Sequence, residues 1–167
     1  MPYLKDRYLR TVTQMVEKIR AQVFVPVSPL TMTCYATTEP VDFAHRTEGR
    51  EMHLHEGDSW GENVFDCGWF HFEGAVPQEC QGKPTVLLID VSGEGLIVDA
   101  QGEPVQGITC VDSQYDFSLG KPGKWVYPFQ DAGVAGSKID VWMDGAQNDL
   151  FGVMRNEGRV QLAQVGV

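Results

Sequence analysis

The chain has 167 residues, which is long enough for one domain with a sizeable hydrophobic core but short for two. Its net charge of −10, from 13 Lys and Arg against 23 Asp and Glu, excludes nucleic acid and anionic membranes as expected partners, because both require a basic patch. No apolar run approaches the roughly 20 residues of a membrane span, and the first residues are charged, so we expect a cytoplasmic protein.

The N-terminal segment has the pattern of an amphipathic helix. Its apolar residues recur at steps of three and four, with charged and polar residues between them: Leu4, Tyr8, Val12, Met15, Val16 and Ile19. Pro26 and Pro29 block helix continuation, so Val23 to Pro29 is expected to be a linker or an edge segment. The sequence therefore predicts a helix and proline-bearing linker over residues 1–29, with an apolar stripe that must be covered by a neighbouring surface.

From residue 30 to residue 167 the pattern is that of β-structure. Runs of β-branched and aromatic residues alternate with Gly, Pro, Asp and Asn, and no helical pattern of useful length returns. The predicted strands are Thr31–Ala36, Trp69–Val76, Thr85–Val91, Gly95–Asp99, Gln114–Leu119, Lys124–Phe129, Lys138–Met143 and Arg159–Val165. The predicted fold class is therefore all-β, a jelly-roll β-sandwich preceded by one α-helix.

Several positions have a predicted role within this sandwich. Residues 86–89 are apolar on both faces and should form a central strand, and residues 99–103 should form a hairpin with Gly102 at positive φ. The strand that contains Trp69, Phe70 and Phe72 needs a buried face, so we expect these three rings in the core. Four widely separated cysteines without a C-x-x-C pair are expected to be reduced and structural: Cys34, Cys67, Cys80 and Cys110.

Several motifs follow one another in a fixed order along the chain. A G-D-x-W-G turn is followed by a W-F strand that ends near a proline, an apolar strand running into Gly-Glu-Gly, a Gly-Glu-Pro-Val-Gln-Gly hairpin and a late Phe-Gly. These stand here at Gly57–Gly61, Trp69–Pro77, Leu87–Gly95, Gly102–Gly107 and Asp144–Gly152. This order resembles the domain that precedes the catalytic barrel in α-mannosidases of glycoside hydrolase family 38.

The resemblance implies a galactose-binding-like jelly roll that lies ahead of a zinc-dependent barrel, which removes α-linked mannose from glycans. In that family the barrel supplies the metal-binding residues and the nucleophilic carboxylate, so this chain is expected to hold no cofactor of its own. Glycosidase chemistry needs two carboxyl groups held several ångströms apart, and no such pair can be identified among the acidic residues near predicted turns. We therefore assign no catalytic residue to this chain.

A metal site is one candidate feature. His53, His55 and Asp58 place two imidazoles and a carboxylate close together in sequence, and His53 and His55 share a face if the segment is extended. Imidazole nitrogen and carboxylate oxygen suit zinc, although solvated loop histidines have the same pattern.

Sugar binding is a second candidate feature, because sandwich modules can stack aromatic rings on sugars and accept hydroxyl hydrogens with carboxylates and amides. Trp60, Trp125, Tyr127 and Trp142 are the candidate platform, with core packing or an interface as the alternative for Trp142. The predicted carbohydrate-binding residues are Trp125, Tyr127, Glu94, Asn148 and Asp149.

Three functions follow from these observations. The first is a non-catalytic accessory domain of an α-mannosidase, which supports the catalytic barrel of the same polypeptide and helps shape glycan access. The second is a free-standing carbohydrate-binding module that takes mannose-containing glycans. The third is a structural domain that forms a homo-oligomer.

Overall fold

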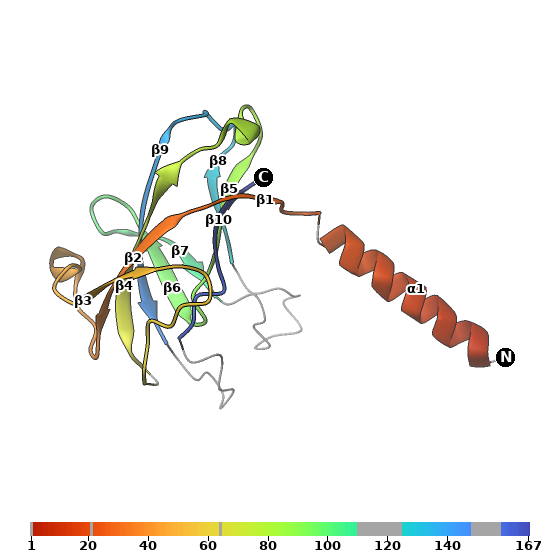
Figure 1. Cartoon of the computed structure of the whole chain (residues 1–167), viewed down its shortest axis with the longest axis horizontal. Helices are drawn as coiled ribbons and strands as arrows, with labels where there is room; N and C mark the ends of the chain where they lie inside the picture. The colour runs from red at the N-terminus through yellow and green to blue at the C-terminus, as the bar shows by residue number, and fades with distance from the viewer. Residues whose placement is uncertain (1, 21, 64, 110–124, 148–157) are drawn as a thin grey trace.

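The computed structural model describes residues 2–20, 22–63, 65–109, 125–147 and 158–167. Its ten strands form two antiparallel sheets, and one helix precedes them (Figure 1). The helices are α1 (Pro2–Arg20) and the short 3₁₀ turns η1 (Phe43–His45) and η2 (Gln78–Cys80). The strands are β1 (Pro26–Pro29), β2 (Thr31–Thr37), β3 (Arg50–Leu54), β4 (Cys67–Ala75), β5 (Thr85–Asp90), β6 (Glu94–Val98), β7 (Pro104–Ile108), β8 (Val126–Gln130), β9 (Lys138–Ala146) and β10 (Leu162–Gly166).

The two sheets contain four and six strands. The strand order is β1-β10-β5-β8 in the smaller sheet and β3-β2-β4-β9-β6-β7 in the larger. Every residue of β5 is buried, which confirms the prediction of a central strand that is apolar on both faces. Pro26–Pro29 pairs with β10, so these residues form an edge strand of the smaller sheet. Of the predicted strands, Gln114–Leu119 lies outside the described residues.

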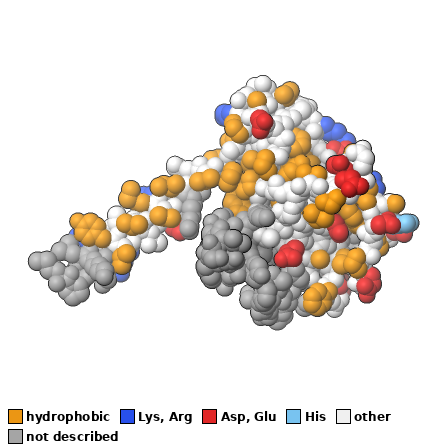
Figure 2. Space-filling view, turned by 180° about the vertical axis from the view of Figure 1, so that it is seen from behind, with side chains coloured by type: hydrophobic (Ala, Val, Ile, Leu, Met, Phe, Trp, Pro, Cys, Tyr) orange, Lys and Arg blue, Asp and Glu red, His pale blue; other side chains and the backbone are white. Residues whose placement is uncertain are grey.

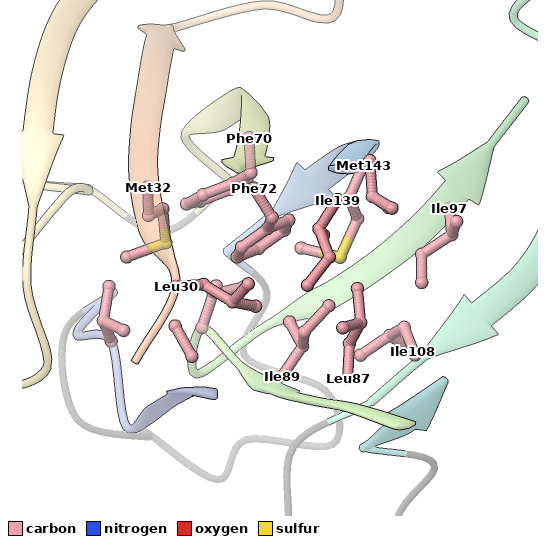
Figure 3. Close-up of a cluster of buried hydrophobic side chains, with 14 of the residues drawn as sticks. Leu30, Met32, Phe70, Phe72, Leu87, Ile89, Ile97, Ile108, Ile139 and Met143 are labelled. Atoms are coloured by element: carbon pink, nitrogen blue, oxygen red, sulfur yellow. The ribbon is translucent and has the colours of Figure 1, made fainter. Parts of the chain in front are cut away.

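The hydrophobic core lies between the two sheets (Figure 3). Side chains from the inner face of the larger sheet pack against those of β5, as the period-two pattern of each strand requires. The core side chains labelled in Figure 3 are Leu30, Met32, Phe70, Phe72, Leu87, Ile89, Ile97, Ile108, Ile139 and Met143. Trp69 is buried as predicted, and it lies on the opposite face of β4 from Phe70 and Phe72.

The G-D-x-W-G turn ties the middle of the chain to its C-terminal segment. The backbone N–H of Gly57 donates to the carbonyl of Val160 at 2.8 Å, and the carboxylate of Asp58 accepts the backbone N–H of His55 at 2.8 Å. Trp60 is 1% exposed, and its Nε1–H donates to the carbonyl of Val91 at 2.8 Å. Trp60 is therefore part of the core, and the prediction that it belongs to a sugar platform is wrong.

The hairpin between β6 and β7 has the predicted glycine conformation. Gly102 has φ +87°, and a Cβ at this position would lie 2.7 Å from the ring of Phe43. The carboxylate of Asp99 accepts the backbone N–H groups of Gln101 and Glu103 at 2.8 and 2.9 Å. Both the backbone conformation and the close approach of Phe43 require glycine here.

Helix α1 extends away from the sandwich in Figure 1. Its apolar stripe is exposed, because Tyr8 is 70% exposed, Val12 56%, Met15 58% and Ile19 62%. In the described part of the chain, no helix has both the length and the apolar character to cross a membrane.

Candidate functional site

Trp125 and Tyr127, the predicted sugar-stacking rings, lie at the start of β8. Trp125 is half-buried, and its ring packs edge-to-face on Phe24 with centroids 5.7 Å apart. Its carbonyl accepts the backbone N–H of Ile89 at 2.8 Å. Tyr127 is also half-buried and packs against the core. Trp125 therefore offers part of its ring to solvent, whereas Tyr127 is committed largely to packing.

Among the described residues, Glu94 is the one predicted polar partner of these rings, and it lies on the other sheet. Glu94 is exposed at the start of β6, opposite Ala146 of the larger sheet, whereas Trp125 and Tyr127 belong to the smaller sheet. Asn148 and Asp149 lie outside the described residues. The sugar-binding assignment of these five residues stays a prediction.

Two of the predicted metal residues, His55 and Asp58, lie together, whereas His53 contacts other side chains. His53 lies on β3, with Nδ1 3.2 Å from the Thr33 hydroxyl and Nε2 3.3 Å from the Glu51 carboxylate. His55 Nδ1 lies 3.4 Å from the carboxylate of Asp58, which also accepts the backbone N–H of His55. Across the ranges that the structure describes, no group of three or more His, Cys, Asp or Glu side chains could hold a metal ion. The metal site at His53, His55 and Asp58 stays a prediction, and we derive no chemistry from it.

The outer face of the larger sheet holds an aromatic cluster that the sequence patterns did not identify. We call it the outer-face cluster, and its members come from three adjacent strands and the turn that follows β2: Tyr35, Phe43, Arg46, Trp69, His71 and Trp142. Because Phe70 and Phe72 point into the core, their neighbours Trp69 and His71 point outward on β4.

Ring stacking organises this cluster. The ring of His71 stacks on that of Trp142 with centroids 4.1 Å apart and planes 9° apart, and Tyr35 stacks on Trp142 at 6.0 Å. Trp142 is half-buried and does not belong to the hydrophobic core, so of the two alternatives to sugar contact, core packing is excluded and a protein interface stays open. Contacts among the rings therefore hold the cluster in one arrangement.

The turn after β2 packs onto this face. Phe43 packs edge-to-face on Trp69 at 5.5 Å, and the Trp69 Nε1–H donates to the carbonyl of Val41 at 3.0 Å. The guanidinium carbon of Arg46 lies 3.9 Å from the ring centroid of Phe43 and 4.7 Å from that of Trp142. Arg46 is therefore bound to the cluster by cation–π contacts.

Carboxylates surround the rings. His71 Nε2 lies 2.8 Å from Asp140 and its Nδ1 lies 3.5 Å from Glu73. Hydrogen bonds from Lys138 and His71 hold the pKa of Asp140 below its ordinary value, whereas burial, together with Glu51 and Glu73, raises the pKa of Tyr35. The rim of the cluster is therefore rich in negative charge.

Asp144 is a second carboxylate of β9, two residues after Trp142. It pairs in register with Trp69 of β4 and Leu96 of β6. Burial raises the pKa of Asp144, although the backbone N–H of Gly145 acts in the opposite direction. A carboxylate that is costly to ionise in the folded chain is destabilising unless another group pairs with it.

Comparison with known proteins assigns the family. The sequence matches the alpha-mannosidase jelly roll domain over residues 25–164, which span both sheets. The chain therefore belongs to this family, and the jelly roll predicted from the sequence is confirmed. A comparison with curated proteins found no match.

Proposed function

We propose that the chain is the non-catalytic accessory domain of an α-mannosidase-type glycoside hydrolase of family 38. In this proposal the sandwich supports the catalytic barrel of the same polypeptide and helps shape glycan access. The observation that supports it is the family match, since the matched residues 25–164 include nearly the whole sandwich. In this proposal zinc belongs to the barrel and not to this chain.

The outer-face cluster is the surface that we assign to contact with the barrel. Trp, Tyr and Arg are the residue types that contribute most to protein interfaces, and Tyr35, Arg46 and Trp142 bring all three together. Their rings are already stacked, so binding would freeze few rotamers. The carboxylates of Glu73 and Asp140 provide a polar rim around them.

The coding sequence beyond Val167 tests this proposal. We expect it to continue into a long α/β region with a His-x-Asp metal motif of the catalytic barrel. A stop codon directly after Val167 would overturn the accessory role and leave binding or assembly as the function of the chain itself.

A free-standing carbohydrate-binding module is the second candidate, and the half-exposed ring of Trp125 favours it. Mannose-containing glycans would be its ligands. Chemical-shift changes with millimolar mannosides that disappear in Trp125→Ala would support this function, and unchanged spectra would exclude it.

We also assign the protein to the cytoplasm. Cys34, Cys67 and Cys80 are buried free thiols, which is the usual state of cysteines in a reducing compartment. Cys110 lies outside the described residues.

A further inference from the structure

Helix α1 exposes an apolar stripe that a helix of a water-soluble domain normally buries. Tyr8, Val12, Met15 and Ile19 follow one another at steps of three and four, and each is more than half exposed. Figure 2 shows hydrophobic side chains along the helix, with a few basic ones among them. Most of the stability of a helix in a protein comes from packing of its apolar face, so the stripe calls for a covering surface.

The charge of the chain is divided between the helix and the rest. Residues 2–20 contain five Lys or Arg and two Asp or Glu, which is a net charge of +3. The remaining residues contain eight Lys or Arg and 21 Asp or Glu, which is a net charge of −13. Two such helices would repel each other, and an anionic membrane would repel the remainder of the chain. The surface that fits the helix is therefore apolar and acidic.

The β6–β7 hairpin, residues 94–108, offers such a surface. Leu96 and Val105 are 37% and 51% exposed, although they belong to strands of the sheet. The hairpin contains three carboxylates and neither Lys nor Arg, a net charge of −3, and these carboxylates are Glu94, Asp99 and Glu103. The apolar residues thus lie between acidic ones.

The geometry of the hairpin also suits a helix. Strand β7 is an edge strand of the larger sheet, and the Gln106 side chain donates to the carbonyl of Val126 at 2.8 Å, so the surface offered to a helix is the outer face that carries Leu96 and Val105. Leu96 pairs with Gly107, and a Cβ at Gly107 would meet no atom within 4 Å, which leaves open space beside Leu96. The stripe from Tyr8 to Ile19 is about 17 Å long at the helical rise, and a five-residue strand such as β7 has about the same length.

We propose that α1 of one chain docks on the β6–β7 hairpin of a second copy, and that the exchange is reciprocal in a two-fold dimer. The helix leaves the sandwich beside β1, an edge of the smaller sheet, whereas the hairpin belongs to the larger sheet. In this arrangement the helix contacts the hairpin of the partner chain and not its own. In such a dimer each helix covers its apolar stripe on the hairpin of the other chain. A helix with a net charge of +3 then meets a hairpin with a net charge of −3 at each of the two contacts.

Sedimentation velocity of the full chain over a concentration series tests this dimer. The wild-type chain should dimerise, and the dimer should be weaker at high salt. Val12→Asp and Leu96→Asp should each raise the dissociation constant of the dimer about tenfold or more, because each places a charge in an apolar contact. Val134→Asp is the matched control, since Val134 is 57% exposed outside both elements and should leave the dimer unchanged.

Mixing and charge exchange make the test specific. A mixture of the Val12→Asp chain and the Leu96→Asp chain should form a mixed dimer, since one intact helix meets one intact hairpin. Arg10→Glu should weaken the dimer, and Glu103→Arg in the same chain should restore part of it. A chain that is monomeric at every concentration would overturn the proposal. A dimer insensitive to Leu96→Asp, or a monomer that binds anionic phosphatidylserine vesicles through α1, would overturn it as well.

Discussion

Replacement of Trp60 by Phe tests whether the tryptophan of the G-D-x-W-G turn is a structural anchor. The side chain is 1% exposed, its ring packs edge-to-face on Phe70 at 5.0 Å and 87°, and its Nε1–H donates to the carbonyl of Val91. Phe keeps an aromatic ring in the core but removes the donor and part of the volume.

The expected cost has two parts. A buried carbonyl that loses its donor costs about 1–3 kcal/mol. A cavity of a few tens of cubic ångströms adds about 1 kcal/mol at roughly 24 cal/mol per Å³. We therefore expect Trp60→Phe to lower the free energy of unfolding by about 2–4 kcal/mol, which is a large share of the roughly 5–15 kcal/mol typical of a domain.

Urea unfolding followed by circular dichroism measures this difference, and the slope of the transition should stay unchanged. Trp125→Phe is the matched control, because Trp125 is half-buried at the start of β8, and this change should cost less than about 0.5 kcal/mol. If the two substitutions cost the same, burial and the hydrogen bond of Trp60 do not stabilise the fold as argued.

Three further predictions follow from the structure. Gly102→Ala should destabilise the fold by about 1–2 kcal/mol or more, because a Cβ is unfavourable at φ +87° and lies 2.7 Å from the Phe43 ring; unchanged urea unfolding would contradict this. Asp144→Asn should raise the melting temperature at pH 7. The pKa of Asp144 is raised in the folded chain, so ionisation of this carboxyl destabilises the fold as pH rises above the unfolded-state pKa. The gain in melting temperature should therefore vanish in acid, and a gain that persists in acid would refute the reasoning. In spectra of the ¹⁵N-labelled chain, the accessory role predicts no shift near Trp125 with millimolar methyl α-mannoside, whereas a saturable shift would favour the binding module.

The sequence predicted the interior strands of both sheets and the edge strand β8, left β1 as a linker or an edge segment, and missed the edge strands β3 and β7. Strand β5 is apolar on both faces and was evident, whereas β3 contains Arg50, Glu51 and His53, and β1 and β7 begin with proline. An edge strand needs less apolar character, so its composition can resemble that of a loop. Composition therefore identifies central strands more readily than edge strands.

The outer-face cluster was not predicted because β4 has large rings on both faces. Phe70 and Phe72 alternate with Trp69 and His71, so the period-two pattern does not reveal which set faces the core. Phe43 and Arg46 complete the cluster from a turn distant in sequence from Trp142. A contact between residues so far apart depends on the sheet order, which no local pattern contains.

The most direct test of the accessory role is hydrolysis of an α-linked mannoside by the intact gene product, with Trp142→Ala and the milder Arg46→Gln compared with wild type. If the outer-face cluster supports the catalytic barrel, both variants should lower hydrolysis, whereas the exposed control Val134→Ala should not. Equal hydrolysis by all four proteins, or no hydrolysis by wild type, would contradict the account.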